Sequence, residues 1–502
     1  MTDSAIFLGI DFGTGGCKIT AVSQYGALLG EASTEYRTFF DHPGWSEQEP
    51  ADWYSSMCAS LKKLRESSLD FRKIRAISFD GSTHNAVLLD EHMTPVRRTI
   101  MWTDQRSVQE CAFLRENFGE KIFETAFQMP APTWTLPQMM WLKKHEPEVL
   151  KKTKHVLFVK DFVRYLVTGH AATDHIEAQG TLFFDMRKRS WAEELVKLSG
   201  LEKAALPELV EPADEVGKVT AEAAAETGLP EGTLVVCGTS DSAAEDYGAG
   251  AVEEGDCIVK LATAGNVNVM TSLPRPFRTT LTYSHVVPGM WYTVSATNAA
   301  ALCQRWFRDA FCGEEKREGE KSGLKAYALM DRLAESSGPG ANGVVFHPYL
   351  QGERSPYWDP RLRASFTGVS IRSTKGDFIR ALLEGVAYSL RDCYGTIEEM
   401  GLPVKRIFLI GGGARSRLWS EIVCNVFDLP LLVPTPGDAS FGTALIAATG
   451  AGVFPDCREA VRKCLHIDRE VRPDANKAEF YRKGFGTYRE IHDALAPLYQ
   501  KL

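Results

Sequence analysis

Near its start the sequence combines an acid with a glycine-rich turn, a pattern suited to holding phosphate and a metal ion. The apolar run 6–10 leads into Asp11, and glycines follow within 13–16. Because glycine has no Cβ, the N–H groups of such a turn can converge on an anion. A carboxylate beside the turn could hold the metal ion that accompanies a nucleotide's phosphates.

A second stretch of the sequence has the same form. Residues 257–270 are predicted to form a strand, a turn and a strand, with Thr263 and Gly265 in the turn. Two such turns in one chain could grip a nucleotide's phosphates from opposite sides. The alternative is an ordinary β-hairpin, because a hydrophobic strand followed by glycines is also typical of hairpin turns. Neither stretch has the glycine spacing of a Walker loop.

A second acid follows another apolar strand. The strand predicted at 233–237 ends in a turn of small residues, which leads to Asp241 and an alanine-rich helix start. A carboxylate near a helix N-terminus is kept ionised by the partial positive charge there. The alternative is that Asp241 only caps the helix. The two interpretations are compatible, since a capping acid can also face a ligand.

Polar loops follow two further apolar runs. Residues 74–79 lead into Thr83 and His84, and residues 100–102 lead into Asp104. In open α/β sheets, the loops at the carboxyl ends of strands are where ligands bind. We therefore expect these loops to bind a ligand rich in hydroxyl groups. The alternatives are a surface histidine at 84 and an ordinary core aromatic at Trp102.

The elements that must position these residues repeat along the chain. Each half opens with a glycine hairpin and later carries an apolar strand that ends in glycine, at 79–81 and 410–413. This repetition suggests a duplicated α/β domain with a nucleotide in the intervening cleft, joined at 248–255. Apolar spacing predicts a helix at 51–66. We also expect helices at 297–311, 377–399 and 475–498, a helix of small residues at 442–448, and a mostly helical stretch at 107–230.

Composition limits the class of protein. A chain of 502 residues is too long to fold around a single hydrophobic core. Its composition, 44% hydrophobic and 24% charged residues, is typical of a soluble globular protein. A net charge of -8 argues against nucleic acid as the main partner. We expect no membrane partner, because no stretch approaches the roughly 20 apolar residues of a span. The eleven cysteines, without a Cys-x-x-Cys pair, indicate reduced thiols, and we expect a cytoplasmic protein.

Taken in order, the motifs resemble the FGGY family of carbohydrate kinases, and most closely its xylulokinase branch. The resemblance covers nearly the whole chain, and the order and spacing of its motifs are more specific than any one of them. They are found at 11–18, 44–48, 84–90, 102–104, 145–147, 160–161, 348–356, 383–385 and 411–416.

The resemblance implies a fold, an activity and cofactors. The fold is α/β, with two duplicated ribonuclease H-like domains of the actin/hexokinase type, 1–250 and 251–502, flanking a nucleotide and sugar cleft. The activity is transfer of the γ-phosphoryl group of ATP, with Mg²⁺, to a hydroxyl of an open-chain sugar, a ketopentose such as D-xylulose. The partners are then a small sugar and ATP, and a homodimer is one expectation for its assembly.

The resemblance also implies roles for individual residues. By motif position Asp241 is similar to the general base, and Asp11 to the acid that orients Mg²⁺ and the phosphates, so both are expected beside the metal. The expected sugar-binding residues are Thr83, His84, Trp102, Asp104 and Ser242. The expected nucleotide-binding residues are Gly13, Thr14 and Lys18 in the first loop, Thr263 and Gly265 in the second, and Gly412, Gly413 and Arg417 in the adenosine motif.

Departures from the xylulokinase pattern keep the sugar open. Ser82-Thr83-His84 stands where xylulokinases commonly have Gln-Met-His, and Ser242 stands where they have asparagine. A serine lacks the two-ended hydrogen bonding of an amide. Residues 305–316 also resemble the family's autoinducer-2 kinases, so another ketose, a polyol or autoinducer-2 is an alternative substrate. An alternative class is an actin/Hsp70-like ATP-driven switch, which would not need the sugar-side residues.

Overall fold

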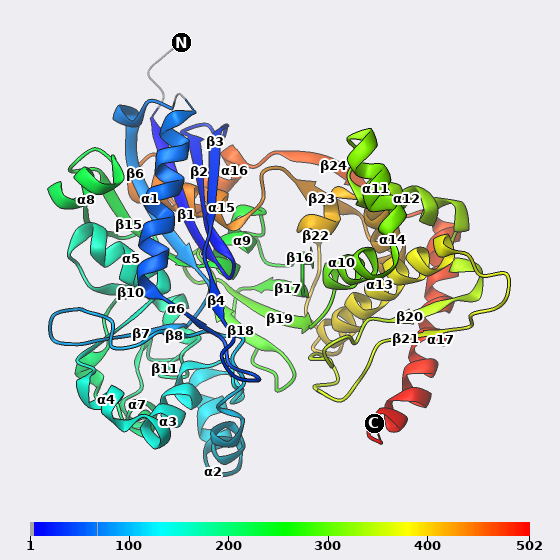
Figure 1. Ribbon diagram of the computed structural model, residues 1–502, viewed down its shortest axis with the longest axis horizontal. Coiled ribbons are helices and arrows are strands. Elements are labelled where there is room, and N and C mark those ends of the chain that lie inside the picture. Colours follow the sequence, from blue (N-terminus) through cyan, green and yellow to red (C-terminus); the bar gives the residue numbers. More distant parts are fainter. Residues whose placement is uncertain (1–4, 68, 502) are drawn as a thin grey trace. The chain divides into compact units, whose positions relative to one another are not determined.

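Two α/β units make up the part of the chain that the computed structural model describes, residues 5–67 and 69–501 (Figure 1). Neither unit is a continuous stretch of sequence. Unit 1 consists of Met1–Val252, Thr282–Trp291 and Pro436–Leu465. Unit 2 consists of Glu253–Leu281, Tyr292–Thr435 and His466–Leu502.

Unit 1 is built on a six-stranded sheet in the order β14-β15-β6-β1-β2-β3. The strands are β14 (Glu215–Lys218), β15 (Leu234–Ser240), β6 (Ile74–Gly81), β1 (Ile6–Gly13), β2 (Gly16–Ser23) and β3 (Leu28–Glu35). The first glycine stretch is the tight turn between β1 and β2, which pair antiparallel. Strands β1, β6 and β15 run parallel, so their carboxyl ends meet at one edge of the sheet.

Helices cover both faces of this sheet. Successive side chains of β1 point to opposite faces, so they pack against different helices. Leu8, Ile10 and Phe12 point into an apolar core with α1 (Pro50–Glu66) and α5 (Val159–Thr168). Gly9 points the other way, toward α15 (Ala439–Gly450), where a Cβ would lie 1.9 Å from the Ser440 carbonyl oxygen. Helix α9 (Asp241–Gly248) packs beside α15 on that face.

The second sheet has seven strands in the order β18-β19-β17-β16-β22-β23-β24. They are β18 (Leu281–Ser284), β19 (Trp291–Thr297), β17 (Gly265–Thr271), β16 (Asp256–Leu261), β22 (Arg406–Ile410), β23 (Leu431–Pro434) and β24 (Ile467–Val471). The second glycine stretch joins β16 and β17, and β22 runs parallel to β16. The core of unit 2 packs around the long helix α13 (Lys375–Glu399).

The longer helices predicted from the sequence are present, although the one predicted at 297–311 begins at Ala301, after β19 ends at Thr297. The helices predicted at 51–66, 297–311, 377–399, 442–448 and 475–498 are α1, α10 (Ala301–Phe311), α13, α15 and α17 (Ala475–Tyr499). The prediction for 107–230 needs correction, because short strands alternate with the helices there. Two of these, β9 (His155–Phe158) and β10 (Ala172–Asp174), pair with strands distant in sequence, so tertiary pairing outweighs local preference.

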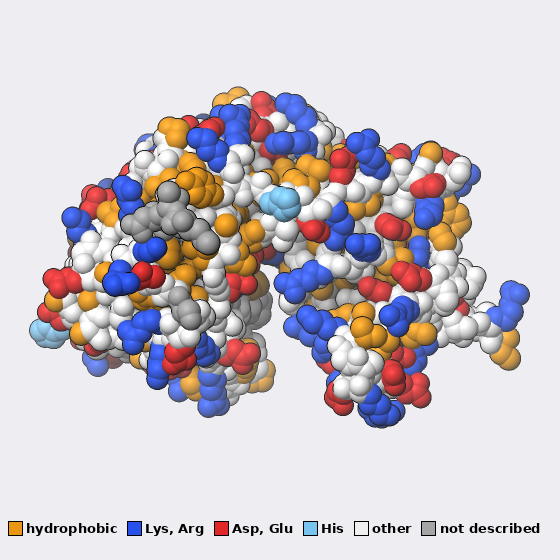
Figure 2. Space-filling view, turned by 90° about the horizontal axis from the view of Figure 1, so that it is seen from above, with side chains coloured by type: hydrophobic (Ala, Val, Ile, Leu, Met, Phe, Trp, Pro, Cys, Tyr) orange, Lys and Arg blue, Asp and Glu red, His pale blue; other side chains and the backbone are white. Residues whose placement is uncertain are grey.

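Two surface properties bear on the partners expected from the sequence. Figure 2 shows lysine and arginine side chains interspersed with aspartate and glutamate on the face it presents, which differs from the single-sign surface that nucleic-acid binding uses. Across the described residues, none of the helices combines the length and apolar character needed to cross a lipid bilayer.

Candidate active site

Asp11 lies near the end of β1, two residues before the last residue of that strand, Gly13. In the sheet it is opposite Lys18 of β2 and Asp80 of β6. Its carboxylate atom Oδ1 is buried and has no hydrogen-bond partner. Burial, followed by the charge of Asp241, raises the pKa of Asp11 to about 7. The two acids singled out in the sequence are therefore close enough to interact electrostatically.

Asp80 is a third acid at this edge of the sheet, and sequence reasoning missed it. Its side chain is fully buried, and Oδ2 accepts a hydrogen bond of 2.5 Å from the Thr443 hydroxyl. Burial and the charge of Asp11 raise the pKa of Asp80 well above its usual range. The available signal was an acid between Phe79 and Gly81, at the end of a strand already expected to carry a ligand-binding loop.

Asp241 is the first residue of α9, at the carboxyl end of β15. Ser240 occupies the N-cap position, so Asp241 is not the N-cap residue of α9. The Asp241 atom Oδ1 accepts hydrogen bonds from the Ser242 backbone N–H at 2.6 Å and from the Thr83 hydroxyl at 3.4 Å. The structure thus brings Thr83 and Ser242 to the acid, Ser242 through its backbone.

His84 lies in the loop after β6 and is buried, so the alternative of a surface histidine is wrong. Its backbone has a φ of 55°, an unusual value for a residue other than glycine. The ring atom Nε2 lies 3.2 Å from the Thr133 hydroxyl, and the ring packs against Trp134. Burial lowers the pKa of His84 to about 3, so the imidazole is neutral at physiological pH.

In the second polar loop, one of the predicted residues reaches the first glycine turn and the other does not. The half-buried Trp102 donates a hydrogen bond from its indole N–H to the Thr14 hydroxyl at 3.1 Å. Asp104 is fully buried instead, and its carboxylate accepts hydrogen bonds from the Arg106 guanidinium and the Ser46 N–H. Its internal partners give Asp104 a role in holding this loop.

Asn85 joins the two polar loops and was not singled out in the sequence. The Asn85 side-chain amide nitrogen donates to the Ser82 backbone carbonyl oxygen at 2.6 Å. The side-chain oxygen Oδ1 accepts a hydrogen bond from the Trp102 backbone N–H at 2.5 Å. The residue is fully buried. Its amide therefore fixes the loop of Thr83 against the loop of Trp102.

The first glycine turn is braced from its surroundings. The Tyr36 hydroxyl donates to the Gly13 carbonyl oxygen, and the Gln48 amide donates to the Thr14 carbonyl oxygen at 2.8 Å. These bonds occupy carbonyl oxygens and leave the exposed Thr14 side chain at the tip of the turn.

Lys18 is engaged with two acids of unit 1. Its ammonium lies 2.5 Å from Glu31 Oε1 and 2.6 Å from Asp438 Oδ2. Burial alone would lower the pKa of Lys18, but the charges and hydrogen bonds of Asp438 and Glu31 together raise it. Asp438 also caps α15 by accepting the Phe441 N–H. The lysine therefore ties the phosphate hairpin to that helix.

In unit 2 the second glycine turn lies against the start of α10. The Thr263 carbonyl oxygen accepts the Ala300 N–H at 3.0 Å. Gly265 is required by packing, because a Cβ there would lie 2.8 Å from Leu390 Cδ2 and 2.9 Å from Thr297 Cγ2. The Thr263 side chain is exposed.

The glycines 411–413, which the sequence predicts to bind adenosine, follow β22 and differ in what surrounds them. At Gly411, with a φ of 89°, a Cβ would lie 2.6 Å from the Leu261 carbonyl oxygen. At Gly413 it would lie 2.8 Å from Leu261 Cβ. Gly412 faces open space, and Arg417 is an exposed residue at the start of α14 (Arg417–Phe427). The motif thus packs on the end of β16 and presents Gly412 outward.

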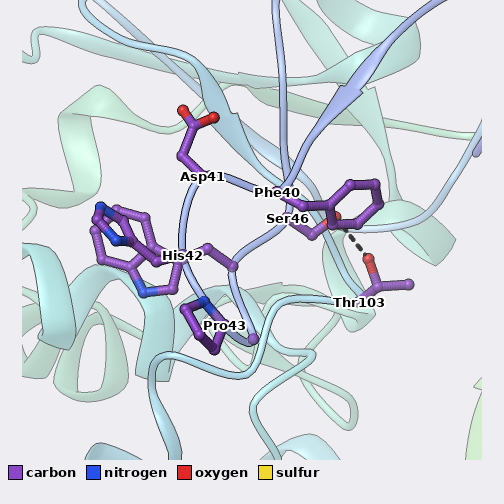
Figure 3. A pocket seen from close by; sticks show the side chains of 8 residues that line it. Phe40, Asp41, His42, Pro43, Ser46 and Thr103 are labelled. Atoms are coloured by element: carbon purple, nitrogen blue, oxygen red, sulfur yellow. Dashed lines mark hydrogen bonds between the residues drawn. The ribbon is translucent and has the colours of Figure 1, made fainter.

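A surface cavity of about 450 Å³ adjoins the second polar loop in unit 1. It is lined by residues 40–46 and by Thr103, whose hydroxyl donates to the Ser46 hydroxyl at 2.9 Å (Figure 3). Its lining contains none of the residues predicted to bind sugar or nucleotide. We therefore assign the candidate site to the strand ends and not to this cavity.

The acids at the strand ends suit a magnesium ion. Magnesium is usually held by one or two carboxylates, with waters and substrate phosphates completing its shell. The unpaired buried oxygen of Asp11, with Asp241 nearby, offers such a donor set. Among the residues that the structure describes, no group of three or more His, Cys, Asp or Glu side chains forms a metal cage made of protein alone.

Comparison with known proteins identifies the class to which this fold and site belong. Residues 6–248 match the N-terminal domain, and residues 259–451 the C-terminal domain, of the FGGY family of carbohydrate kinases. The chain belongs to this family, as its motifs indicated. It is an ATP-dependent sugar kinase with a two-domain α/β fold, and these matches favour the kinase over the alternative of a protein switch.

Individual relatives resemble the chain along nearly its whole length. A xylulose kinase of Staphylococcus epidermidis is 31% identical over 491 residues, which cover 97% of this chain and 96% of the relative. A gluconokinase of Bacillus licheniformis is 27% identical over 99% of this chain and 98% of its own. The crystal structure of xylulose kinase from Rhodospirillum rubrum has a TM-score of 0.87 at 28% identity, covering 99% of this chain and 100% of that chain.

Proposed function

We propose that this kinase transfers the γ-phosphoryl group of ATP to a hydroxyl group of D-xylulose. Similarity to a xylulose kinase over nearly the whole chain supports the choice of a ketopentose. The observation that carries the chemistry is the contact of Asp241 with Thr83, beside the neutral His84. An acid at a helix N-terminus next to groups that can orient hydroxyls is the arrangement that a general base for alcohol phosphorylation needs.

In the proposed reaction Asp241 accepts the proton of the acceptor hydroxyl. The hydroxyl oxygen forms its bond to the γ-phosphorus while the bond to the β,γ-bridging oxygen breaks, and ADP leaves with that oxygen. Thr83, His84, Trp102, Asp104 and Ser242 orient the sugar directly or through their loops. Catalysis of this kind rests on positioning and charge neutralisation more than on covalent chemistry.

Asp11 and Asp241 would hold Mg²⁺, which when bound neutralises charge on the transferring phosphates. We assign the remaining nucleotide contacts by motif. They are Gly13, Thr14 and Lys18 at the first glycine turn, Thr263 and Gly265 at the second, and Gly412, Gly413 and Arg417 after β22. The hydrogen bond from Trp102 to Thr14 supports this assignment, since it joins the sugar-side loop to the phosphate turn. We place the reaction in the cytoplasm, where ATP is available.

An ADP-release assay coupled to NADH oxidation tests the substrate. D-xylulose is compared with other ketopentoses, ketotetroses, polyols, gluconate and autoinducer-2. We expect the highest kcat/KM with D-xylulose, and a higher value with any other acceptor would replace it. The Asp241→Asn variant is expected to lose about 10²–10⁴ in kcat, the range for a general base. Near-normal turnover in that variant would remove Asp241 from the mechanism.

A further inference from the structure

A single helical turn in unit 1 contacts both halves of the candidate sugar site. This turn is α6 (His175–Gln179), which follows β10 directly. Its N-cap residue Asp174 and its residue Glu177 are both buried, with 0% and 1% of their surface exposed. Acids buried to this degree are rare unless each has specific partners.

Asp174 is bonded to the strand that carries Asp241. Its atom Oδ1 accepts hydrogen bonds from the Thr239 hydroxyl at 2.9 Å and from the backbone N–H groups of Ile176 and Glu177. Thr239 precedes Asp241 by two residues. The base of α6 is therefore attached at the carboxyl end of β15.

Glu177 is bonded to the other half of the site. Its atom Oε1 accepts the backbone N–H of His84, whose left-handed conformation is costly for a residue with a side chain. The Thr135 hydroxyl holds the His84 carbonyl oxygen at 2.7 Å. The Glu177 carboxylate thus holds the peptide between Thr83 and His84, and the Thr83 hydroxyl reaches Asp241.

Buried cations pair with Asp174 and with the neighbouring Asp161. The Lys160 ammonium lies 2.6 Å from Asp161 Oδ1 and 2.9 Å from Asp174 Oδ2. The Arg164 guanidinium lies 2.9 Å from Asp161 Oδ1 and donates to the Cys237 carbonyl oxygen of β15 at 2.8 Å. Because side chains and backbone of four elements meet here, α6 cannot shift without moving its neighbours.

We propose that Glu177 is a positioning residue for the sugar: it holds Thr83 and His84 at a fixed distance from Asp241, because its own turn is anchored on the strand that ends in Asp241. This inference rests on the proposed function, in which these three residues face the acceptor. It assigns Glu177 no contact with the substrate. It implies that the position of the Glu177 acceptor oxygen, more than its charge, determines affinity for the sugar.

Two substitutions separate position from charge. Glu177→Gln keeps an oxygen acceptor at the same reach and removes the ionisable carboxyl group, whereas Glu177→Asp keeps a carboxyl group and withdraws the acceptor by roughly 1.5 Å. We expect E177Q to retain the wild-type KM for D-xylulose within about threefold. We expect E177D to raise that KM about tenfold, the size of one hydrogen bond, and to leave the KM for ATP within about twofold. The control E110D makes the same change in a buried glutamate of α2 (Val108–Ala126) and should behave as wild type.

Amide hydrogen exchange gives a readout that does not depend on turnover. Peptides covering 82–86 should exchange faster in E177D than in wild type, with E177Q and E110D unchanged. Equal exchange and equal sugar KM in E177D and E177Q would overturn the inference, as would a reversed order of the two variants. A wild-type protein inactive on D-xylulose would refute the proposed function instead, and the exchange at 82–86 would still decide whether Glu177 holds this loop.

Discussion

The two units share a strand order and differ in what their strand ends carry. In each, an antiparallel hairpin is followed by two parallel strands and an antiparallel edge strand: β1/β2 with β6, β15 and β14, and β16/β17 with β22, β23 and β24. Unit 1 places the carboxylates of Asp11 and Asp80 at its strand ends, whereas β22 of unit 2 ends at Ile410 before three glycines. The same strand arrangement thus ends in buried carboxylates in unit 1 and in glycine backbone in unit 2.

The comparison predicts that substitutions near the two glycine turns change different kinetic constants. We expect Asp11→Asn to lower kcat by about 10² or more, the size of losing one preorganised charged group. Thr263→Ala in the second glycine turn should instead raise the KM for ATP, because it removes the hydroxyl that we propose contacts the phosphates and leaves the acids in place. Steady-state kinetics with ATP and sugar varied in turn measure both. A large kcat loss in T263A with an unchanged KM for ATP would break the division between the units.

The buried carboxyl group of Asp11 should make the stability of unit 1 depend on pH. An aspartate ionises near 3.8 in the unfolded chain and near 7 in the fold, so between these values the folded state binds more protons. Asp11 therefore destabilises the fold increasingly as pH rises from about 4 to 7, by at most about 4 kcal/mol. Asp11→Asn should stabilise the magnesium-free protein more at pH 8 than at pH 5, as measured by urea unfolding. An equal gain at both pH values would contradict this.

In unit 2 the comparison predicts an effect of backbone alone. Gly411 has φ 89° and ψ 174°, a region open essentially only to glycine, so Gly411→Ala should cost about 3 kcal/mol of stability. Gly412→Ala is the matched control for folding, since a Cβ there meets open space. We expect G412A to unfold like wild type and to bind ATP more weakly, because the added methyl group lies where we place the adenosine. Thermal unfolding and the KM for ATP distinguish the two; an unchanged KM in G412A would place the adenosine elsewhere.

The smallest effect is expected where sugar loop and phosphate turn meet. Trp102→Phe keeps the ring and removes the N–H that bonds to Thr14. The loss of one hydrogen bond to an exposed hydroxyl should change kcat/KM by about three- to tenfold. Thr14→Val in the same background should add nothing if the two groups act as a pair, which a double-mutant cycle measures. Fully additive effects would show that the bond has no functional role.

Local patterns account for what was predictable from the sequence. Helices α1 and α13 repeat their apolar residues at helical spacing, so their position needs no knowledge of the fold. The glycine hairpin and the strand, acid and helix pattern at Asp241 are equally local. By contrast, the contact of Lys18 with Asp438 joins residues 420 positions apart, which no local pattern contains.

The site residues that were not predicted from the sequence were missed for a related reason. Asp80 stands inside an apolar run, and only the register of β6 against β1 places it beside Asp11. Glu177 lies in a helix of five residues, too short to show periodicity. The spacing of Asp104 and Arg106 does not reveal that both are buried and paired. In each case the missing information is which strands and loops become neighbours.

The contribution of Pro436–Leu465 to unit 1 has a consequence during protein synthesis. Helix α15 supplies the backbone against which Gly9 packs and the Thr443 hydroxyl that donates to Asp80 Oδ2, so one face of the first sheet lacks its covering helix when residue 252 leaves the ribosome. At about 5–20 residues per second, the missing helix arrives roughly 10–40 seconds later. The first sheet is therefore made long before helix α15, which covers one of its faces. During that interval the uncovered face is open to binding by a chaperone.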